Sequence, residues 1–347
     1  MLTHQDILDK LRVTFPEENG VALVARYADN DLQLPERRAH IFIGDCHMLN
    51  DDDTLAYPKY QFLQEQDLNR LLSGLIKLKK DSPGHLRVWH LGDLFDVWRA
   101  RGGLGDEAEM AKIASDRHEI VDKLRGPLRA RIIAGNHDYP LFTSPHWRAD
   151  RYRILDNDDP DGGDIFVLHG DVFSGIERLH DNIQGIAVRF ATWHEAGTKN
   201  LFQDGDVLSA ANRDLDRDTP FGTEPRVLAS ASADDLVFSQ AEHYNVIDGD
   251  AEDPDAGNTK PFPLAKVLGE KMRERGHNVR LMVTGHTHWA RLIKGTVAGS
   301  PFVLMDCGAW IGYVKRSQDE EAIHSGQIGV LVGNEMCLYQ IGYRKVA

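Results

Sequence analysis

The chain is poor in cysteine, in basic residues relative to acidic ones, and in long apolar runs. Its 3 cysteines are too few for a disulfide framework and lack zinc-finger spacing. No run is apolar for long enough to span a bilayer or to form a signal-peptide core, so we expect a cytoplasmic protein. Lys and Arg number 40 against 54 Asp and Glu, a formal net charge of −14. This balance makes nucleic acid an unexpected partner, because phosphate backbones are bound by clustered Lys and Arg.

The chain does contain enough apolar residues for a substantial core. Hydrophobic residues make up 41% of its 347 residues, which allows one large domain or a domain with an inserted cap. Apolar, β-branched runs alternate with stretches of helical spacing, a pattern that indicates an α/β (α+β) protein. Helices are expected at residues 60–80, 105–125 and 263–276. An amphipathic helix at residues 2–15 is expected to dock on the body, with contact to a membrane surface as the alternative.

The same pattern suggests how the chain is divided. We expect an N-terminal extension before the first strand at residues 1–38. The core is expected to comprise residues 39–171 and 261–347, with an inserted cap at residues 172–260. The cap is expected to open on an amphipathic helix through Ile176, Leu179, Ile183, Ile186 and Phe190, because these residues recur at spacings of three and four. Strands within residues 301–310 and 326–341 are expected to form a second sheet packed on the first.

Five short polar segments each follow an apolar, β-branched run. They are Asp45-Cys46-His47, Gly92-Asp93-Leu94-Phe95-Asp96, Gly135-Asn136-His137-Asp138, His169-Gly170-Asp171 and Gly285-His286-Thr287-His288. Each is expected at the carboxyl end of a strand, which is where open α/β sheets place their ligands. Because all five loops carry Asp, Asn or His, one shared metal site is the simplest interpretation.

These loops supply seven candidate ligands of the kind that holds two divalent cations. They are Asp45, His47, Asp93, Asn136, His169, His286 and His288. Asp93 can bridge, with one oxygen for each cation. Residues two apart at a strand end can face the same way, as in the pair Asp45 and His47 and again in the pair His286 and His288. No thiolate is required, so we expect two ions of Mn²⁺, with Fe, Zn or Co as alternatives.

In this order, the motifs D-x-H, G-D-x-x-D, G-N-H-D, H-G and G-H-x-H resemble those of the calcineurin-like metallophosphoesterase superfamily. The resemblance covers residues 45–288 and implies a sandwich of two mixed sheets flanked by helices. The ligand roles that it implies are Asp45, His47 and His288 on one metal, Asn136, His169 and His286 on the other, and Asp93 as the bridge. It also implies that His137 is an outer-sphere acid or phosphate contact, oriented by Asp138.

A finer resemblance involves the second motif and the insertion. The run GDLFDVW and the insertion after His169-Gly170-Asp171 are similar to those of the bacterial UDP-2,3-diacylglucosamine hydrolase group, which cleaves a lipid-linked pyrophosphate. That group commonly has Arg in the third motif where this chain has His137, and the insertion here is long and acidic.

The expected function is that of a dinuclear-metal phosphoester hydrolase in which a metal-bound hydroxide attacks phosphorus directly. Phosphatase, phosphodiesterase and pyrophosphatase activities on a small-molecule or nucleotide-type substrate all stay open. The alternative is a non-catalytic metal-binding scaffold on the same fold, and the complete ligand set with His137 favours the enzyme. The substrate and the oligomeric state are not specified by the sequence.

Covalent phosphatase mechanisms fit the sequence poorly. A Cys phosphatase needs an Arg at the sixth position after its nucleophile, and the residues found there are Asp52, Tyr313 and Tyr343. A haloacid dehalogenase-type site needs D-x-D-x-T/V after a strand, whereas Asp51 and Asp53 are followed by Leu55 and follow no strand.

Some residues near the motifs have two open interpretations. Asp96, Asp171 and Asp306 are expected either to orient ligand imidazoles or to cap loops. Cys46, between two candidate ligands, is expected to be a small buried residue.

Overall fold

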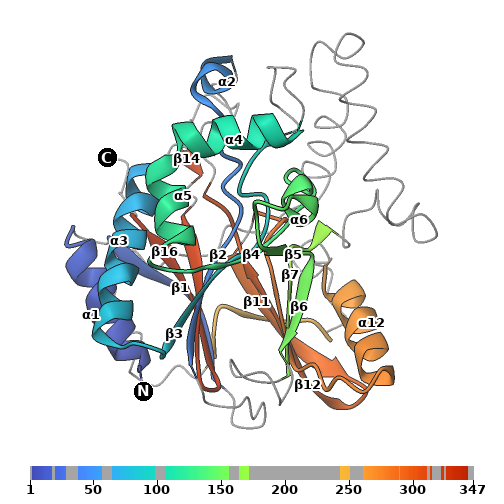
Figure 1. Cartoon of the computed structure of the whole chain (residues 1–347). Helices are drawn as coiled ribbons and strands as arrows, with labels where there is room; N and C mark the ends of the chain where they lie inside the picture. The colour runs from blue at the N-terminus through green and yellow to red at the C-terminus, as the bar shows by residue number, and fades with distance from the viewer. Residues whose placement is uncertain are drawn as a thin grey trace.

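The computed structural model describes residues 2–17, 20–28, 38–56, 65–97, 106–155, 164–171, 243–250, 261–288, 290–310, 313–314, 322–323 and 326–342. These parts form two large β-sheets packed face to face, with helices on the outer faces, and one separate pair of short strands (Figure 1). Apolar side chains from both sheets, among them Phe42, Trp89 and Leu281, fill the space between them. The expected sandwich of two mixed sheets flanked by helices is therefore confirmed.

The larger sheet has eight strands in the order β5-β4-β3-β2-β15-β16-β1-β8. Their bounds are β5 Ala149–Asp150, β4 Arg131–Ile133, β3 Leu86–His90, β2 Ala39–Ile43, β15 Gln327–Val332, β16 Glu335–Ile341, β1 Val21–Ala28 and β8 His243–Tyr244. Strands β2 to β5 run parallel, whereas β15 is antiparallel to β2. Every residue of β2 is buried, as in central parallel strands covered on both faces.

The smaller sheet has six strands in the order β6-β7-β10-β12-β11-β9. Their bounds are β6 Tyr152–Leu155, β7 Ile165–Leu168, β10 Leu281–Thr284, β12 Ser300–Cys307, β11 Ala290–Val297 and β9 Val246–Asp248. Strands β7, β10 and β12 run parallel, and β11 is antiparallel to β12. Two short strands, β13 (Tyr313–Val314) and β14 (Ala322–Ile323), pair with each other.

Helices cover the outer face of each sheet. Their bounds are α1 His4–Thr14, α2 Asp51–Ala56, α3 Glu65–Asp81, α4 Asp106–Asp116, α5 His118–Arg125, α6 Pro140–Thr143 and α12 Pro261–Glu274. Helices α1, α3 and α5 pack on the larger sheet and α12 on the smaller one (Figure 1). Within the described residues, no helix combines the length and the apolar character that crossing a bilayer requires.

Local sequence explains where helix α1 begins and which of its faces is buried. Helix α1 begins at a capping box in which Thr3 and Asp6 satisfy each other's backbone N–H groups. Its buried residues Ile7, Leu8 and Leu11 lie on one face, which packs against α3. The expected amphipathic helix docked on the body is therefore confirmed.

The C-terminal strands do not form a sheet of their own, contrary to the expectation. Strand β12 lies in the smaller sheet between β10 and β11, whereas β15 and β16 join the larger sheet beside β2. The first strand also comes earlier than residue 39, because β1 pairs along its length with β16. The segment interpreted as an N-terminal extension thus supplies both a helix and a strand to the sandwich.

Two further expectations are modified. The helix expected over residues 105–125 is two helices, α4 and α5, separated at Arg117. Residues 243–248, within the interpreted cap, add β8 to one sheet and β9 to the other. Residues 172–242 lie outside the described residues, and with them the expected helix from Ile176 to Phe190. The division into a core and an inserted cap stays a prediction.

Candidate metal centre

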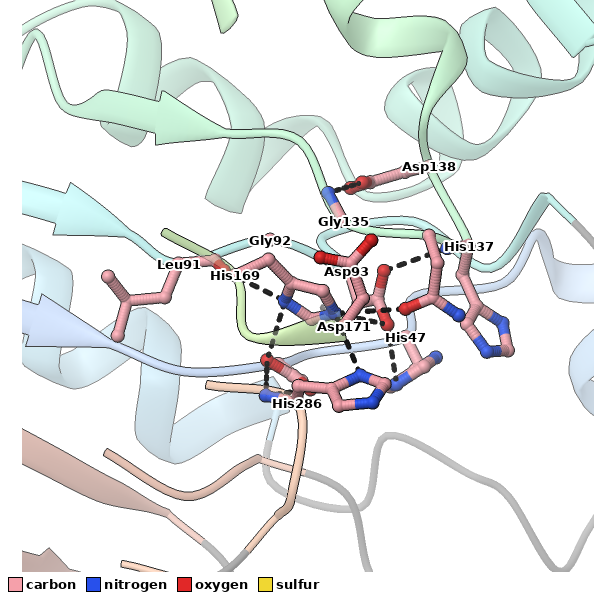
Figure 2. Close-up of polar contacts among 12 residues, drawn as sticks. His47, Leu91, Gly92, Asp93, Gly135, His137, Asp138, His169, Asp171 and His286 are labelled. Atoms are coloured by element: carbon pink, nitrogen blue, oxygen red, sulfur yellow. Dashed lines mark hydrogen bonds and ion pairs between the residues drawn. The ribbon is translucent and has the colours of Figure 1, made fainter. Parts of the chain in front are cut away.

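The five motif loops meet at one place, although their strands belong to different sheets. The loops after β2, β3 and β4 carry Asp45, His47, Asp93 and Asn136, and the loops after β7 and β10 carry His169, His286 and His288. Figure 2 shows His47, Asp93, His169 and His286 directed toward one another from separate loops. The two-sheet sandwich therefore brings together side chains that neither sheet holds alone.

One group of candidate ligand atoms consists of those of Asp45, His47 and His288. The Nε2 atom of His288 lies 3.2 Å from Asp45 Oδ2 and 3.2 Å from His47 Nε2. The backbone carbonyl of Asp45 accepts a hydrogen bond from Trp310 N at 2.7 Å, which fixes this loop to the segment after β12.

A second group consists of Asp93, His169 and His286, with Asn136 beside it. The Nε2 atom of His169 lies 3.2 Å from Asp93 Oδ2, 3.1 Å from Asn136 Oδ1 and 3.2 Å from His286 Nδ1. Asp93 Oδ2 is also 3.5 Å from His47 Nε2 of the first group. Asp93 therefore lies between the two groups of candidate ligands and within reach of both.

The chemistry of these donors fits divalent cations. Imidazole nitrogens face each other at 3.2 Å in the pairs His47–His288 and His169–His286, and Asp45 and Asp93 are almost wholly buried beside them. Converging lone pairs and buried carboxylates are costly unless a proton or a cation lies between them. The donor set of carboxylate, imidazole and amide oxygen suits Mn, Fe, Zn or Co.

The protonation equilibria favour the metal-binding forms of three candidate ligands and the protonated form of a fourth. Burial alone would raise the pKa of Asp93, yet His169 and His137 hold it well below its ordinary value. Burial, reinforced by the neighbouring His169, lowers the pKa of His286 to about 4. Burial and His137 also lower the pKa of His47. An ionised Asp93 and neutral His47 and His286 are the states that bind a cation. Although burial opposes it, Asp93 and Asp45 raise the pKa of His169 well above its ordinary value, so a cation has to displace a proton from this ring.

Backbone conformations at the ligands are unusual. His47, Asp93, His286 and His288 have φ angles of 46°, 49°, 71° and 62°, in the left-handed region that non-glycine residues rarely adopt. Such conformations cost about 1–3 kcal/mol each and concentrate at functional sites. Four strained residues among seven candidate ligands support a functional interpretation of this cluster.

Glycines in the motifs make room for the ligand side chains. A Cβ atom on Gly92, whose φ is +108°, would collide with the ring of His169. A Cβ atom on Gly135 would collide with the carboxylate of Asp93. The motif pattern therefore combines ligands with the glycines that let ligands from other loops approach.

The sequence model of the calcineurin-like phosphoesterases matches residues 41–290 of this chain. The chain belongs to the calcineurin-like phosphoesterase family. The match contains all five motifs, and it supports metal-dependent phosphoester hydrolysis as the reaction class. A search of curated proteins found no match to this chain.

In this calcineurin-like phosphoesterase, His137 lies beside the two groups of ligands. Its backbone N–H donates to Asp93 Oδ1 at 2.9 Å, and its ring meets that of His47 edge to face at 4.5 Å. Its Nδ1 atom is 3.0 Å from Asp96 Oδ1, and the other oxygen of Asp96 is 3.4 Å from His47 Nδ1. Asp96 therefore holds the ring of His137 by a hydrogen bond and lies close to the ring of the candidate ligand His47 without a hydrogen bond to its Nδ1.

Asp138 does not have the position that the sequence suggested. Its carboxylate accepts hydrogen bonds from the backbone N–H groups of Gly135 at 2.7 Å, Leu94 at 2.6 Å and Phe95 at 3.3 Å. Figure 2 shows it directed at Gly135, away from the cluster. The expectation that Asp138 orients His137 is wrong: Asp138 fastens the second motif loop to the third, and Asp96 contacts the His137 ring.

The other two carboxylates also contact groups other than imidazole. Asp306 accepts from Thr287 Oγ1 and lies 3.5 Å from Arg291 Nη2, so it supports the loop between His286 and His288. Asp171 forms an ion pair with Arg151. Cys46 is fully buried, as expected, with its sulfur 3.3 Å from His90 Nε2.

Sequence reasoning missed two contributors to the site. The carbonyl of Leu91 lies 2.9 Å from His169 Nδ1, a contact that directs Nε2 toward the ligand cluster. Arg151 contacts both the third and the fourth motif loops. Neither has a local sequence signal, because one acts through its backbone and the other is an isolated Arg between strands.

Proposed function

We propose that this chain hydrolyses a phosphoester or pyrophosphate bond with two divalent cations, Mn²⁺ in the first instance. Membership of the calcineurin-like phosphoesterase family supports the reaction class. The observation that carries the proposal of two cations is the place of Asp93, whose Oδ2 lies within 3.5 Å of His47 in one group and of His169 in the other.

Each cation has its own proposed ligands. Asp45, His47 and His288 would hold one, Asn136, His169 and His286 the other, and Asp93 both. When bound, such cations stabilise the charge on phosphoryl oxygens and acidify water so that hydroxide is available near neutral pH. His137 would donate a proton or a hydrogen bond to the leaving oxygen, with Asp96 holding its ring.

Metal removal tests the proposal of two cations. Stripping the purified protein with a chelator is expected to abolish hydrolysis of a chromogenic phosphoester, and titration with Mn²⁺ is expected to restore it as two equivalents bind. The readouts are metal content by atomic absorption and initial rate on the same samples. Full activity in metal-free protein would refute the mechanism, and two bound cations without turnover on mono-, di- and pyrophosphoesters would favour the scaffold.

The proposed attack on phosphorus is direct, without a covalent enzyme intermediate. The thiolate is the reactive form of cysteine. Burial withdraws the thiolate from water, and this is the main reason why the pKa values of Cys46, Cys307 and Cys337 are raised. All three side chains are fully buried. A cysteine nucleophile is therefore disfavoured by environment as well as by spacing.

The Cys46→Ala variant is expected to keep most of the wild-type activity. Cys46 lies between the proposed ligands Asp45 and His47 in the sequence but is not itself a proposed ligand, and its sulfur contacts His90. Hydrolysis of a chiral phosphoester in ¹⁸O-labelled water should invert the configuration at phosphorus in both proteins. Retention of configuration, or a trapped phosphoenzyme, would show a double displacement.

We propose only the chemical class of the substrate, a phosphoester or pyrophosphate. The resemblance to the UDP-2,3-diacylglucosamine hydrolase group makes a lipid-linked pyrophosphate one member of the substrate panel, next to nucleotides and simple monoesters. The cytoplasmic location stays a prediction, and so does the interpretation of residues 172–260 as an inserted cap.

A further inference from the structure

The chain passes from one sheet to the other at a single residue beside the metal centre. Strand β5 of the larger sheet ends at Asp150 and strand β6 of the smaller sheet begins at Tyr152, so Arg151 alone joins them. The ligands of the second group are divided in the same way. Asn136 follows β4 of the larger sheet, whereas His169 and His286 follow β7 and β10 of the smaller one.

The guanidinium of Arg151 binds both sides of this division. Its Nη1 donates to the backbone carbonyl of Ala134 at 3.1 Å, and its Nη2 donates to the carboxylate of Asp171. Ala134 lies two residues before Asn136, and Asp171 two residues after His169. The same guanidinium lies over the ring of Tyr139, 5.5 Å from its centroid. One rigid side chain therefore connects the loop of Asn136 to the loop of His169.

Backbone hydrogen bonds carry this connection into the second group. Ala134 N donates to Asp150 O at 2.8 Å, so Ala134 is held from both sides by the β5–Arg151 segment. On the other side, Gly285 N donates to His169 O at 2.8 Å, which joins the loop of His169 to that of His286. Arg151 thus contacts the loops of Asn136 and His169 directly. It reaches the loop of His286 through one further hydrogen bond, from Gly285 N to His169 O.

The first group is held by other contacts. Asp45 accepts from Trp310 N at 2.7 Å, and His47 N donates to Asp93 O at 2.8 Å. Thr287, next to His288, donates to Asp306. These anchors come from β12, from the segment after it and from the loop after β3, and none of them is a contact of Arg151. The loop of His286 reaches the first group through its N–H, which donates to Asp45 Oδ2 at 2.9 Å.

Charge adds to the geometric argument. The Asp171 side chain is 4% exposed, and Arg151 is its ion-pair partner. Breaking a buried ion pair by removing one partner is strongly destabilising, because the remaining charge is left without compensation. Loss of Arg151 would leave the buried Asp171 carboxylate, two residues after His169, without this partner, and we expect the loop that carries His169 to shift in response.

We infer that Arg151 is a positioning residue that sets the geometry of the Asn136–His169–His286 cation site and has little influence on the Asp45–His47–His288 site. The inference rests on the two-cation function proposed above. Supporting groups behind metal ligands typically change metal affinity about 10- to 100-fold when they are replaced, and that is the range expected here for one site only.

The experiment measures Mn²⁺ affinity site by site in metal-free protein. His288→Ala weakens the first site and leaves the second to be titrated, and Asn136→Ala does the reverse. Adding Arg151→Gln to His288→Ala should weaken Mn²⁺ binding about 10- to 100-fold, whereas adding it to Asn136→Ala should change the affinity little. In the otherwise wild-type chain, the electron paramagnetic resonance signal of the coupled Mn²⁺ pair should need correspondingly more Mn²⁺ to appear.

Two further variants make the result specific. Arg153→Gln removes the same charge two residues along β6 from a half-exposed side chain, and it should match the wild type. Arg151→Lys keeps the charge but lacks the planar fork that reaches both Ala134 and Asp171, so its affinity should fall between those of wild type and Arg151→Gln. It also provides a milder variant if Arg151→Gln folds poorly by circular dichroism.

The outcomes separate this inference from the proposed function. A wild-type protein that binds fewer than two Mn²⁺ would overturn the two-cation function itself. If the wild type binds two, equal weakening of both sites by Arg151→Gln, or of neither, would overturn the role of Arg151 alone. A raised KM with unchanged metal affinity would also overturn it, because Arg151 would then be a substrate contact.

Discussion

Replacing Asp93 with Asn is expected to release both cations at ordinary metal concentrations and to abolish measurable hydrolysis. The variant keeps the size of the side chain and the carbonyl that can accept from His137 N, but it removes the one charge that both ligand groups share. Lewis-acid stabilisation by bound metal is worth several kcal/mol in the transition state. Since each 1.36 kcal/mol is a factor of ten, the rate should fall by on the order of 10³-fold or more.

Metal content and initial rate, measured on the same preparation, check this result. Asp81→Asn is the matched control, because it removes an equal charge from an exposed carboxylate that pairs with Lys10 on the surface. Exposed ion pairs contribute about 0–1 kcal/mol, so the control should keep two cations and full activity. An Asp93→Asn protein with wild-type metal content would show that the two groups do not share a bridging carboxylate.

The sequence predicted the ligand cluster because its signals are local. Each candidate ligand directly follows an apolar run, and β2, β3, β4, β7 and β10 all form at those runs. A strand end followed by a polar loop can be recognised without knowing which strands are neighbours. The glycines of the motifs were part of the same local pattern, and the structure gives their reason in the close approach of His169 to Gly92 and of Asp93 to Gly135.

The sequence did not predict which sheet each strand joins, because pairing depends on distant partners. Strand β1 has the same apolar character as β2, but no Gly or His occurs between it and β2, so none of the five motif patterns marks its end. Strands β8 and β9 are too short for any periodicity to be visible. The division between α4 and α5 occurs at Arg117, where no glycine or proline marks it.

Which side chains support the candidate ligands also could not be predicted from local sequence. Asp96 and Asp138 are both aspartates within a motif, and local sequence does not say which one reaches the ring of His137. The structure distinguishes them because Asp138 accepts three backbone N–H groups from the second and third loops, while Asp96 faces His137 and His47. Side-chain direction in a loop depends on which other loops lie against it.

The His137→Ala variant is expected to keep both cations and to lose about 10²–10⁴-fold in turnover, the range typical of general acid–base catalysis. His137 neighbours the proposed ligand Asn136, and its Nδ1 atom is held by Asp96 at 3.0 Å. A ring held in this way beside the cluster can protonate a leaving oxygen. The loss should therefore be large for alkyl esters and small for nitrophenyl esters, whose leaving group needs no proton.

Metal content decides between this role and direct ligation, since His137 also forms a compact group with His47 and Asp93. Loss of one cation in His137→Ala would make His137 a ligand and contradict the proposed role. With both cations present, an equal loss for every leaving group would favour electrostatic binding of phosphate over proton donation. His146→Ala, at an exposed histidine after α6, is the matched control and should behave as the wild type for all substrates.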